Sequence, residues 1–187
     1  MPSEYKQYLT FAMIAAASWL LIKLTGLDEG ERVAVPAHSA DYLSTGYSKW
    51  EMDERGKLSS KLLAEKMVHY SDDGTTHLDK PEMFFYNEQT PPWIIKSETG
   101  IRSADGKTIL LNGKVTANRA GTEGVRQLAI NTTNVRVKPE TSYAETDEWA
   151  ELISPPNVTT GTGMKLTFRD PIHLELLANV RGKYETK

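Results

Sequence analysis

Two patterns of hydrophobic and polar residues divide the chain. Residues 9–22 read LTFAMIAAASWLLI without a charge, and the apolar stretch reaches Leu27 when the long side chain of Lys23 extends toward the membrane surface. A helix over residues 9–27 is roughly 28 Å long at about 1.5 Å per residue, which matches the hydrocarbon core of a bilayer. The pattern therefore predicts one transmembrane α-helix within residues 1–27.

The alternative for this segment is a cleaved signal peptide. Such a peptide carries small residues at a cleavage site shortly after its apolar region, and Val35-Pro36-Ala37 is a poor and distant candidate. We therefore expect an uncleaved anchor. Lys6 before the span and acidic residues such as Asp28 after it favour a cytoplasmic N-terminus and an exported remainder, whereas Lys23 and Arg32 argue slightly against this orientation.

Small residues gather on part of the predicted helix. Ala12 and Ala16 lie four positions apart, with Ala15 and Ser18 beside them. Small residues at this spacing let a second helix approach closely, and in lipid this packing replaces a hydrophobic driving force. The sequence thus predicts a specific packing surface, and a generic tether is the alternative.

The remainder of the chain has the pattern of β-strands. Residues 28–41 carry mixed charge and few large apolar side chains, as a linker does. From residue 42 to 187 apolar residues recur at every second position, which indicates strands with one buried face and an all-β domain. The alternating runs are Trp93–Ile101, Val125–Val137, Met164–Phe168 and Leu174–Val180. The turn signals between runs are Asp73-Gly74, Pro91-Pro92, Asp105-Gly106, Pro139-Glu140 and Pro155-Pro156.

One segment fits both periodicities. Within 58–70, Leu62, Leu63, Ala64 and Met67 have helical spacing, whereas period two places Leu62, Ala64 and Val68 on one face. We prefer the strand.

The turn signals also suggest a repeat. A strand, a polar turn and a returning strand recur around Asp73, Asp105 and Pro139, at spacings of 32 and 34 residues. Hairpin-like units of this size bury their apolar faces by stacking on one another, and the ends of the stack leave open edges. A β-sandwich with evenly spaced turns is the alternative.

Composition and chemistry narrow the function. The net charge of −3 gives no reason to expect nucleic acid, and the absence of cysteine excludes disulfides and thiolate chemistry. A two-residue hairpin turn at Asp73-Gly74 would place His77 opposite Tyr70 and His69 opposite Leu78, with no third metal ligand. The acidic residues between Glu145 and Glu151 do not form a recognisable catalytic pair. We therefore expect neither an enzyme nor a metal or cofactor.

Several short motifs resemble the LptC family of lipopolysaccharide export proteins. The resemblance begins with LSSKLLAEKMVHYSD at residues 58–72 and covers nearly the whole chain. Each motif is short, and their common order and spacing make the resemblance specific. The further motifs are Pro81, PWIIKS at 92–97, LLNGKV at 110–115, LAINT at 128–132 and TTGTGMK at 159–165.

The resemblance implies a fold and a set of partners. The expected fold is a twisted, open β-jellyroll of stacked antiparallel strands after one N-terminal transmembrane helix, with Asn112-Gly113 as a bulge within a strand. The expected location is the inner membrane, with the β domain in the periplasm. The expected partners are lipopolysaccharide, LptF- and LptG-type subunits of the inner-membrane ABC transporter at the anchor and the N-terminal edge, and an LptA-type protein at the C-terminal edge.

These expectations select residues for a lipid site. Alternation places apolar side chains on the inner wall, where acyl chains would be buried, and register with the family adds Tyr47 and Leu78. The predicted lipid-contacting residues are Tyr47, Leu62, Leu78, Phe84, Trp93, Ile95, Leu110, Val115, Leu128, Ile130 and Leu166. An ordinary packed core is the alternative for the same side chains, and a scaffold that recruits partners without binding lipid is the alternative function.

The last alternating run predicts a partner interface. If strands stack in sequence order, residues 172–180 form an edge with unpaired backbone groups, which suits β-augmentation by a partner strand. Glycine at the entry to the preceding strand usually marks a bulge, a positive φ angle or close approach of another chain. The predicted interface residues are Gly163, Leu174, Leu176, Leu177, Ala178 and Val180.

Overall fold

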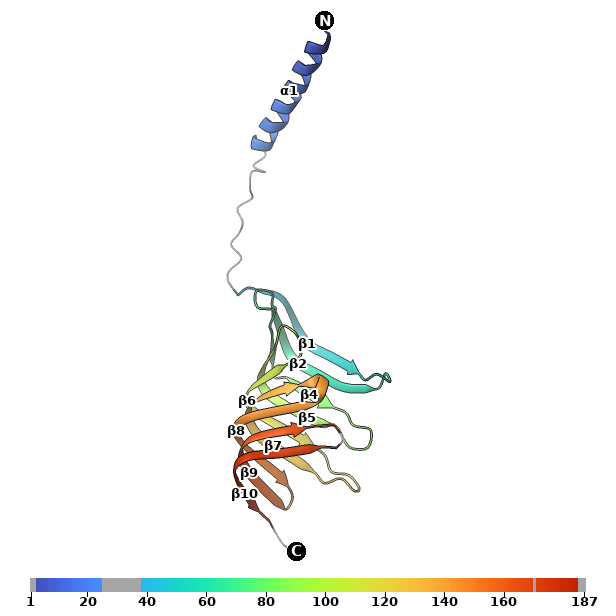
Figure 1. Cartoon of the computed structure of the whole chain (residues 1–187), viewed down its shortest axis with the longest axis vertical. Coiled ribbons are helices and arrows are strands. Elements are labelled where there is room, and N and C mark those ends of the chain that lie inside the picture. Colours follow the sequence, from blue (N-terminus) through green and yellow to red (C-terminus); the bar gives the residue numbers. More distant parts are fainter. Residues whose placement is uncertain (1–2, 25–37, 170, 185–187) are drawn as a thin grey trace. The chain divides into compact units, whose positions relative to one another are not determined.

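The computed structural model describes residues 3–24, 38–169 and 171–184. The chain forms two units, residues 1–36 and 37–187 (Figure 1). The first unit contains helix α1 (Ser3–Leu24), in which Tyr5–Leu24 is long and apolar enough to cross a membrane. The predicted apolar helix is therefore confirmed, while residues 25–27 of the predicted anchor and 28–37 of the predicted linker lie outside the described residues.

The second unit is a ten-stranded antiparallel sheet in which strand order follows the sequence. Strands β3 and β4 together occupy one position between β2 and β5, because each pairs with both. The all-β expectation is thus confirmed, and the sheet begins at Ala40, inside the predicted linker. The strands are β1 (Ala40–Met52), β2 (Leu58–Tyr70), β3 (Thr76–Asp79), β4 (Glu82–Phe85), β5 (Trp93–Arg102), β6 (Ile109–Arg119), β7 (Leu128–Lys138), β8 (Tyr143–Ser154), β9 (Asn157–Thr167) and β10 (His173–Lys183), with a 3-10 turn at Pro139–Thr141.

A line of irregularities crosses the middle of this sheet. In β6, Gly113 has φ +76° and the pairing with β7 shifts register between Leu111 and Lys114, so the predicted bulge at Asn112-Gly113 is confirmed. The extra residue of a bulge bends its strand and increases the twist. Residues with a positive φ at comparable mid-strand positions are Gly46, Lys80 (between β3 and β4), Asn134, Gly163 and Asn179.

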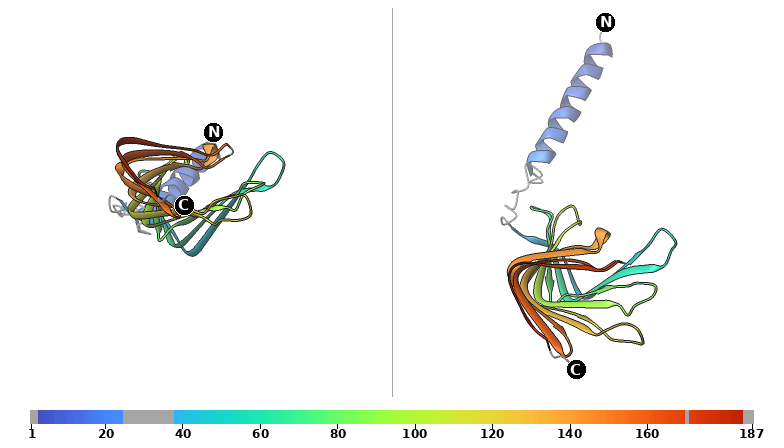
Figure 2. Two further views of the ribbon diagram at one scale, coloured as in Figure 1. Left: turned by 90° about the horizontal axis from the view of Figure 1, so that it is seen from below. Right: turned by 60° about the horizontal axis from the view of Figure 1, so that its bottom comes forward.

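The bends fold the sheet over on itself, so that it forms two facing layers (Figure 2). Phe168 directly follows β9, and its ring stacks on that of Phe85, at the end of β4, with centroids 4.8 Å apart. Because β4 and β9 run in opposite directions in the ladder, their C-terminal ends lie at opposite ends of the sheet. Only folding can bring these ends together. The apolar core fills the space between the layers.

The structure tests the predicted strand at residues 58–70 and the predicted hairpin turn at Asp73-Gly74. Strand β2 has the bounds of the segment for which we preferred a strand. The two-residue hairpin at Asp73-Gly74 is wrong, because Tyr70 N–H donates to Thr75 O and the turn takes Ser71 to Gly74. His69 therefore faces Thr76, and His77 faces Val68.

A candidate lipid-binding interior and two open edges

The space between the two layers is lined by large apolar side chains. Alternation along each strand and the facing layers together remove these side chains from water. Each methylene group buried in such a place is worth about 0.8 kcal/mol, and burial of this kind requires no particular direction of bonding. Seven of the residues predicted to contact lipid lie here and are at most 7% exposed: Leu62, Leu78, Trp93, Ile95, Val115, Ile130 and Leu166. Tyr47 and Leu128 are partly buried and pack against the same core.

Two residues that were predicted to contact lipid, Leu110 and Phe84, lie on the outer face of the sheet. Leu110 is 40% exposed, between the buried Ile109 and Leu111. Phe84 is half-buried between Met83 and Phe85, both of which face inward, and its ring stacks on that of Tyr86 with centroids 6.4 Å apart. The prediction that Leu110 and Phe84 face the interior is therefore wrong, because neighbouring apolar residues in a strand take opposite faces.

Aromatic rings close one side of the interior. Besides stacking on Phe85, the Phe168 ring meets the edge of the Trp93 ring at a centroid distance of 5.5 Å. Asn87 Nδ2 donates to Phe168 O at 2.9 Å, so a loop from one layer also bonds to the end of the other. We call the cluster of Phe85, Asn87, Trp93 and Phe168 the mouth, since the two layers meet here. Entry of a long apolar molecule at this side requires these contacts to separate.

Strands β1 and β2 carry a polar cluster apart from the mouth, formed by Lys49, Glu51 and Ser60. Glu51 accepts hydrogen bonds from Lys49 Nζ at 2.5 Å and from Ser60 Oγ at 2.7 Å. Burial raises the pKa of Glu51, but these bonds and the charges of Lys49 and Arg102 outweigh burial and hold the pKa below its usual value. Glu51 is therefore an anion at neutral pH, and it attracts Arg102 from the end of β5.

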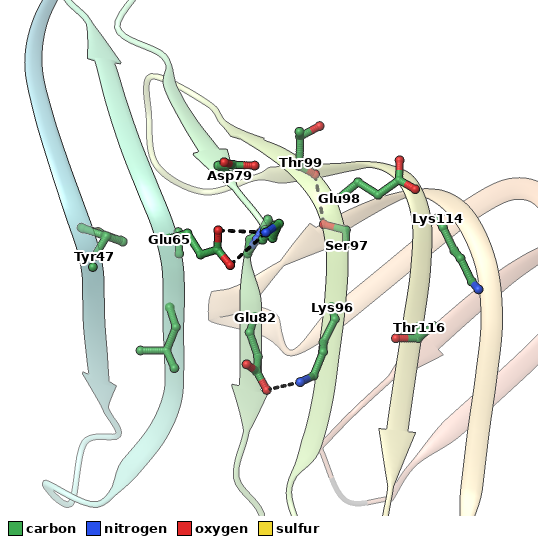
Figure 3. Close-up of a pocket in the computed structure, with 15 residues that line it drawn as sticks. Tyr47, Glu65, Asp79, Glu82, Lys96, Ser97, Glu98, Thr99, Lys114 and Thr116 are labelled. Carbon is green, nitrogen blue, oxygen red and sulfur yellow. Dashed lines mark hydrogen bonds and ion pairs between the residues drawn. The ribbon is translucent and has the colours of Figure 1, made fainter.

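Beside the line of bulges, strands β1 to β6 border an open hollow of about 1080 Å³ (Figure 3). Its lining mixes apolar surface with ion pairs: Lys80 with Glu65 at 3.0 Å, and Lys96 with Glu82 at 2.9 Å. Tyr47 borders the hollow as well as the core. The alternating runs of the sequence do not predict this hollow, because its residues come from several strands and lie together only through the pairing of those strands.

The sheet has two unpaired edges. Strand β1 pairs only with β2, and β10 only with β9, so the predicted C-terminal edge is present. Gly163 lies inside β9 rather than at its entry; its φ is +75°, and a Cβ there would lie 3.0 Å from the Leu177 side chain. Of the features expected of this glycine, the positive φ is therefore observed, and the neighbour that approaches it is Leu177 of the same chain. Of the predicted interface residues in β10, Leu174 and Leu176 are half-buried, whereas Leu177, Ala178 and Val180 are exposed.

Comparison with known proteins decides the family. The profile described as "Lipopolysaccharide-assembly, LptC-related" matches residues 8–185. The chain belongs to the LptC family. No curated protein matches the chain. Among solved structures, the chain is similar to LptH, the LptA-homologous periplasmic component of the lipopolysaccharide transport device from Pseudomonas aeruginosa, with 6% identity, a TM-score of 0.47, and coverage of 78% of this chain and 94% of that one.

Membership of the LptC family gives the chain a general role in lipopolysaccharide transport. The family is a transport component that is anchored in the inner membrane and is not known as an enzyme, and α1 provides one apolar helix for a single-pass anchor. Ala12, Ala15, Ala16 and Ser18 all lie exposed on α1. Within the described ranges, no group of three or more His, Asp or Glu side chains is arranged to hold a metal ion.

Proposed function

We propose that this LptC-family protein receives lipopolysaccharide from an LptF- and LptG-type ABC transporter and passes it to an LptA-type periplasmic protein. In this proposal α1 spans the inner membrane with its N-terminus in the cytoplasm, and the sheet lies in the periplasm. Ala12 and Ala16, with Ala15 and Ser18, form the surface of α1 that packs on transporter helices. No cofactor is needed, because the transporter supplies the work.

The apolar interior carries the lipid-binding part of the proposal. Acyl chains gain free energy when they leave water for an apolar space, whereas sugars and phosphates lose hydrogen bonds there. A sheet folded into two layers with an openable side accommodates both requirements, since the chains lie between the layers and the polar headgroup stays outside. The buried positions Leu78, Ile130 and Leu166 then form the wall that touches acyl chains.

The two open edges support a hand-over from one protein to the next. A strand with free backbone groups can pair with the edge of another sheet, which continues the sheet and its apolar interior across the boundary. Strand β1 would meet the transporter side and β10 the LptA-type partner. With these partners at the two edges, lipopolysaccharide would move along the sheet from β1 toward β10.

Site-specific photocrosslinking tests this function. A photoreactive residue in place of Leu78, inside the sheet, should capture lipopolysaccharide when the assembled transporter hydrolyses ATP. The same residue in place of Leu110 should capture little, because that position lies on the outer face. Equal capture at both positions, or capture at neither while transport continues, would contradict the interior as the lipid path.

The alternative function is a membrane-anchored scaffold, and the packed interior is the observation that favours it. Side chains that fill the interior as fully as Trp93 and Ile130, both 0% exposed, also suit an ordinary core. A scaffold would still assemble with its partners through β1 and β10. It would show no ATP-dependent capture of lipid from position 78, which separates the two functions.

A further inference from the structure

Three buried polar atoms have no hydrogen-bond partner among the described residues: Thr90 Oγ1, Trp93 Nε1 and Arg119 Nε. They lie in or beside one corner of the sheet. Trp93 and Arg119 face each other across β5 and β6, and Arg119 Cζ lies 5.3 Å from the centroid of the Trp93 ring. Thr90 is three residues before Trp93, in the loop that joins β4 to β5.

The chemistry of these atoms points to an acceptor. The indole and guanidinium N–H groups can only donate hydrogen bonds, and the Thr90 hydroxyl can donate as well as accept. A buried donor without a partner is rare in folded proteins, and such a group calls for an explanation. Arg119 also carries a positive charge, and the one bond of its Nη2 in the described structure, to Arg126 O, is long at 3.4 Å. A group that satisfies this corner must therefore present oxygen acceptors and negative charge.

We propose that Arg119, Trp93 and Thr90 form a subsite for a phosphate monoester on the headgroup of the bound glycolipid. The proposal rests on the proposed function, since it places the headgroup where acyl chains enter the interior. Trp93 belongs to the mouth, so a phosphate held there leaves the apolar chains directed between the layers. A guanidinium offers paired N–H groups that fit phosphate oxygens, and such charge-assisted bonds are stronger than neutral ones.

The position of Trp93 Nε1 and Arg119 Nε beside the mouth also explains why these donors are buried without a hydrogen-bond partner among the described residues. Trp93 is 0% exposed, and its ring is covered by Phe168 and by the guanidinium of Arg119. When Phe168 moves aside to admit acyl chains, the same movement uncovers the Trp93 ring with its indole N–H, beside the guanidinium that is already partly exposed. Lipid entry and headgroup recognition are then coupled at one place.

The test compares two glycolipids on the full-length, detergent-solubilised protein. One is a lipopolysaccharide-type glycolipid with its phosphate monoesters, and the other is the same glycolipid after phosphatase treatment. Wild type should bind the phosphorylated form about tenfold or more tightly, a ratio typical of hydrogen bonds to charged groups. Arg119→Gln should abolish most of this preference, and Trp93→Phe, which keeps an aromatic ring but removes the donor, should reduce it several-fold.

Two controls keep the result interpretable. Arg126→Gln removes the same charge from the neighbouring exposed loop and should leave the preference unchanged. Inorganic phosphate, followed through the indole ¹⁵N–H resonance that Trp93→Phe deletes, shows the source of the anion. A response to inorganic phosphate that Arg119→Gln removes supports a general phosphate site. No response, with the glycolipid preference intact, supports recognition of the headgroup alone.

Failure of this subsite differs from failure of the proposed function. If Arg119→Gln and Trp93→Phe keep the full preference for the phosphorylated glycolipid, or if wild type shows none while both glycolipids crosslink at position 78, the subsite is wrong. A purely structural role of Arg119 would lower the unfolding temperature of Arg119→Gln without changing the ratio of affinities, and that outcome also overturns the subsite. If a photoreactive residue at position 78, in a protein that is otherwise wild type, captures neither glycolipid, the proposed function itself fails.

Discussion

The two edge strands of the sheet differ in how they are attached to the rest of the domain. In β1 no residue is buried, and its contact with the core comes from Tyr47. In β10, Leu174 and Leu176 both pack against the core. The exposed large apolar side chains of the two edges are Tyr42, Leu43, Trp50 and Met52 in β1, and Leu177 and Val180 in β10.

Because of this difference, side chains of β1 can serve partner docking without contributing to folding stability, whereas side chains of β10 contribute to both. Strand β1 is held by its backbone ladder to β2, which extends along nearly its whole length, and its side chains remain available to a partner. Strand β10 completes the core while it offers a free backbone edge. Truncating the exposed side chains of β1 should therefore change partner binding alone, whereas truncating the core-packing side chains of β10 should change both partner binding and folding.

The largest effect is expected from truncating a core-packing side chain of β10. Leu176→Ala should lower the free energy of unfolding by about 2 kcal/mol, since it removes apolar contacts and leaves a cavity. Trp50→Ala, although it deletes a larger side chain, should change the free energy by less than about 0.5 kcal/mol because Trp50 is 63% exposed. Urea unfolding of the two variants measures both values. Equal losses would show that the two edges are attached in the same way.

A smaller change in the free energy of unfolding is expected from alanine at two matched glycines, one near each edge of the sheet. Gly163 in β9, beside β10, and Gly46 in β1 both have a positive φ, near +75° and +68°. Alanine in this conformation costs roughly 1–2 kcal/mol. Gly163→Ala should cost about 1.5 kcal/mol and Gly46→Ala about 1 kcal/mol, because the Cβ at position 163 would also press on Leu177, whereas a Cβ at position 46 would meet nothing within 4 Å.

Thermal unfolding of both alanine variants measures this difference. Asparagine tolerates the left-handed region better than alanine, so Gly46→Asn should recover most of the loss at Gly46. Gly163→Asn should not recover it, because Leu177 still obstructs the side chain. If the two alanine variants lose the same free energy of unfolding, crowding against Leu177 does not destabilise the protein, and this prediction is wrong.

The sequence predicts the strands better than the faces of the strands. Period two identifies β2 over its full length and places Met164, Leu166 and Phe168 correctly inside. It fails beyond the bulges, because an extra residue can exchange the two faces. In β7, Ile130 is buried before the bulge and Val135 is buried after it. Residues 130 and 135 are an odd number of positions apart, so a single period-two series cannot contain both.

The candidate site is predictable only in part, for a related reason. Apolar residues such as Trp93 and Ile130 are evident wall candidates from their own strands. The mouth is not evident, because Phe168 and Phe85 are distant in the sequence and meet only when the sheet folds over. Trp93 Nε1 and Arg119 Nε lack a hydrogen-bond partner among the described residues because of the neighbours that the fold places around them, and no sequence motif records those neighbours.

The most direct test of the account is to lock the mouth and follow lipid capture. The chain has no cysteine, so cysteines introduced at Asn87, in one layer of the mouth, and at Arg169, next to Phe168 of the other layer, can be joined selectively by a short reducible crosslinker. With the bridge in place, ATP-dependent capture of lipopolysaccharide by a photoreactive residue at position 78 should fall to background, and reduction of the bridge should restore it. Undiminished capture in the locked protein would contradict entry of lipid between the two layers at this side.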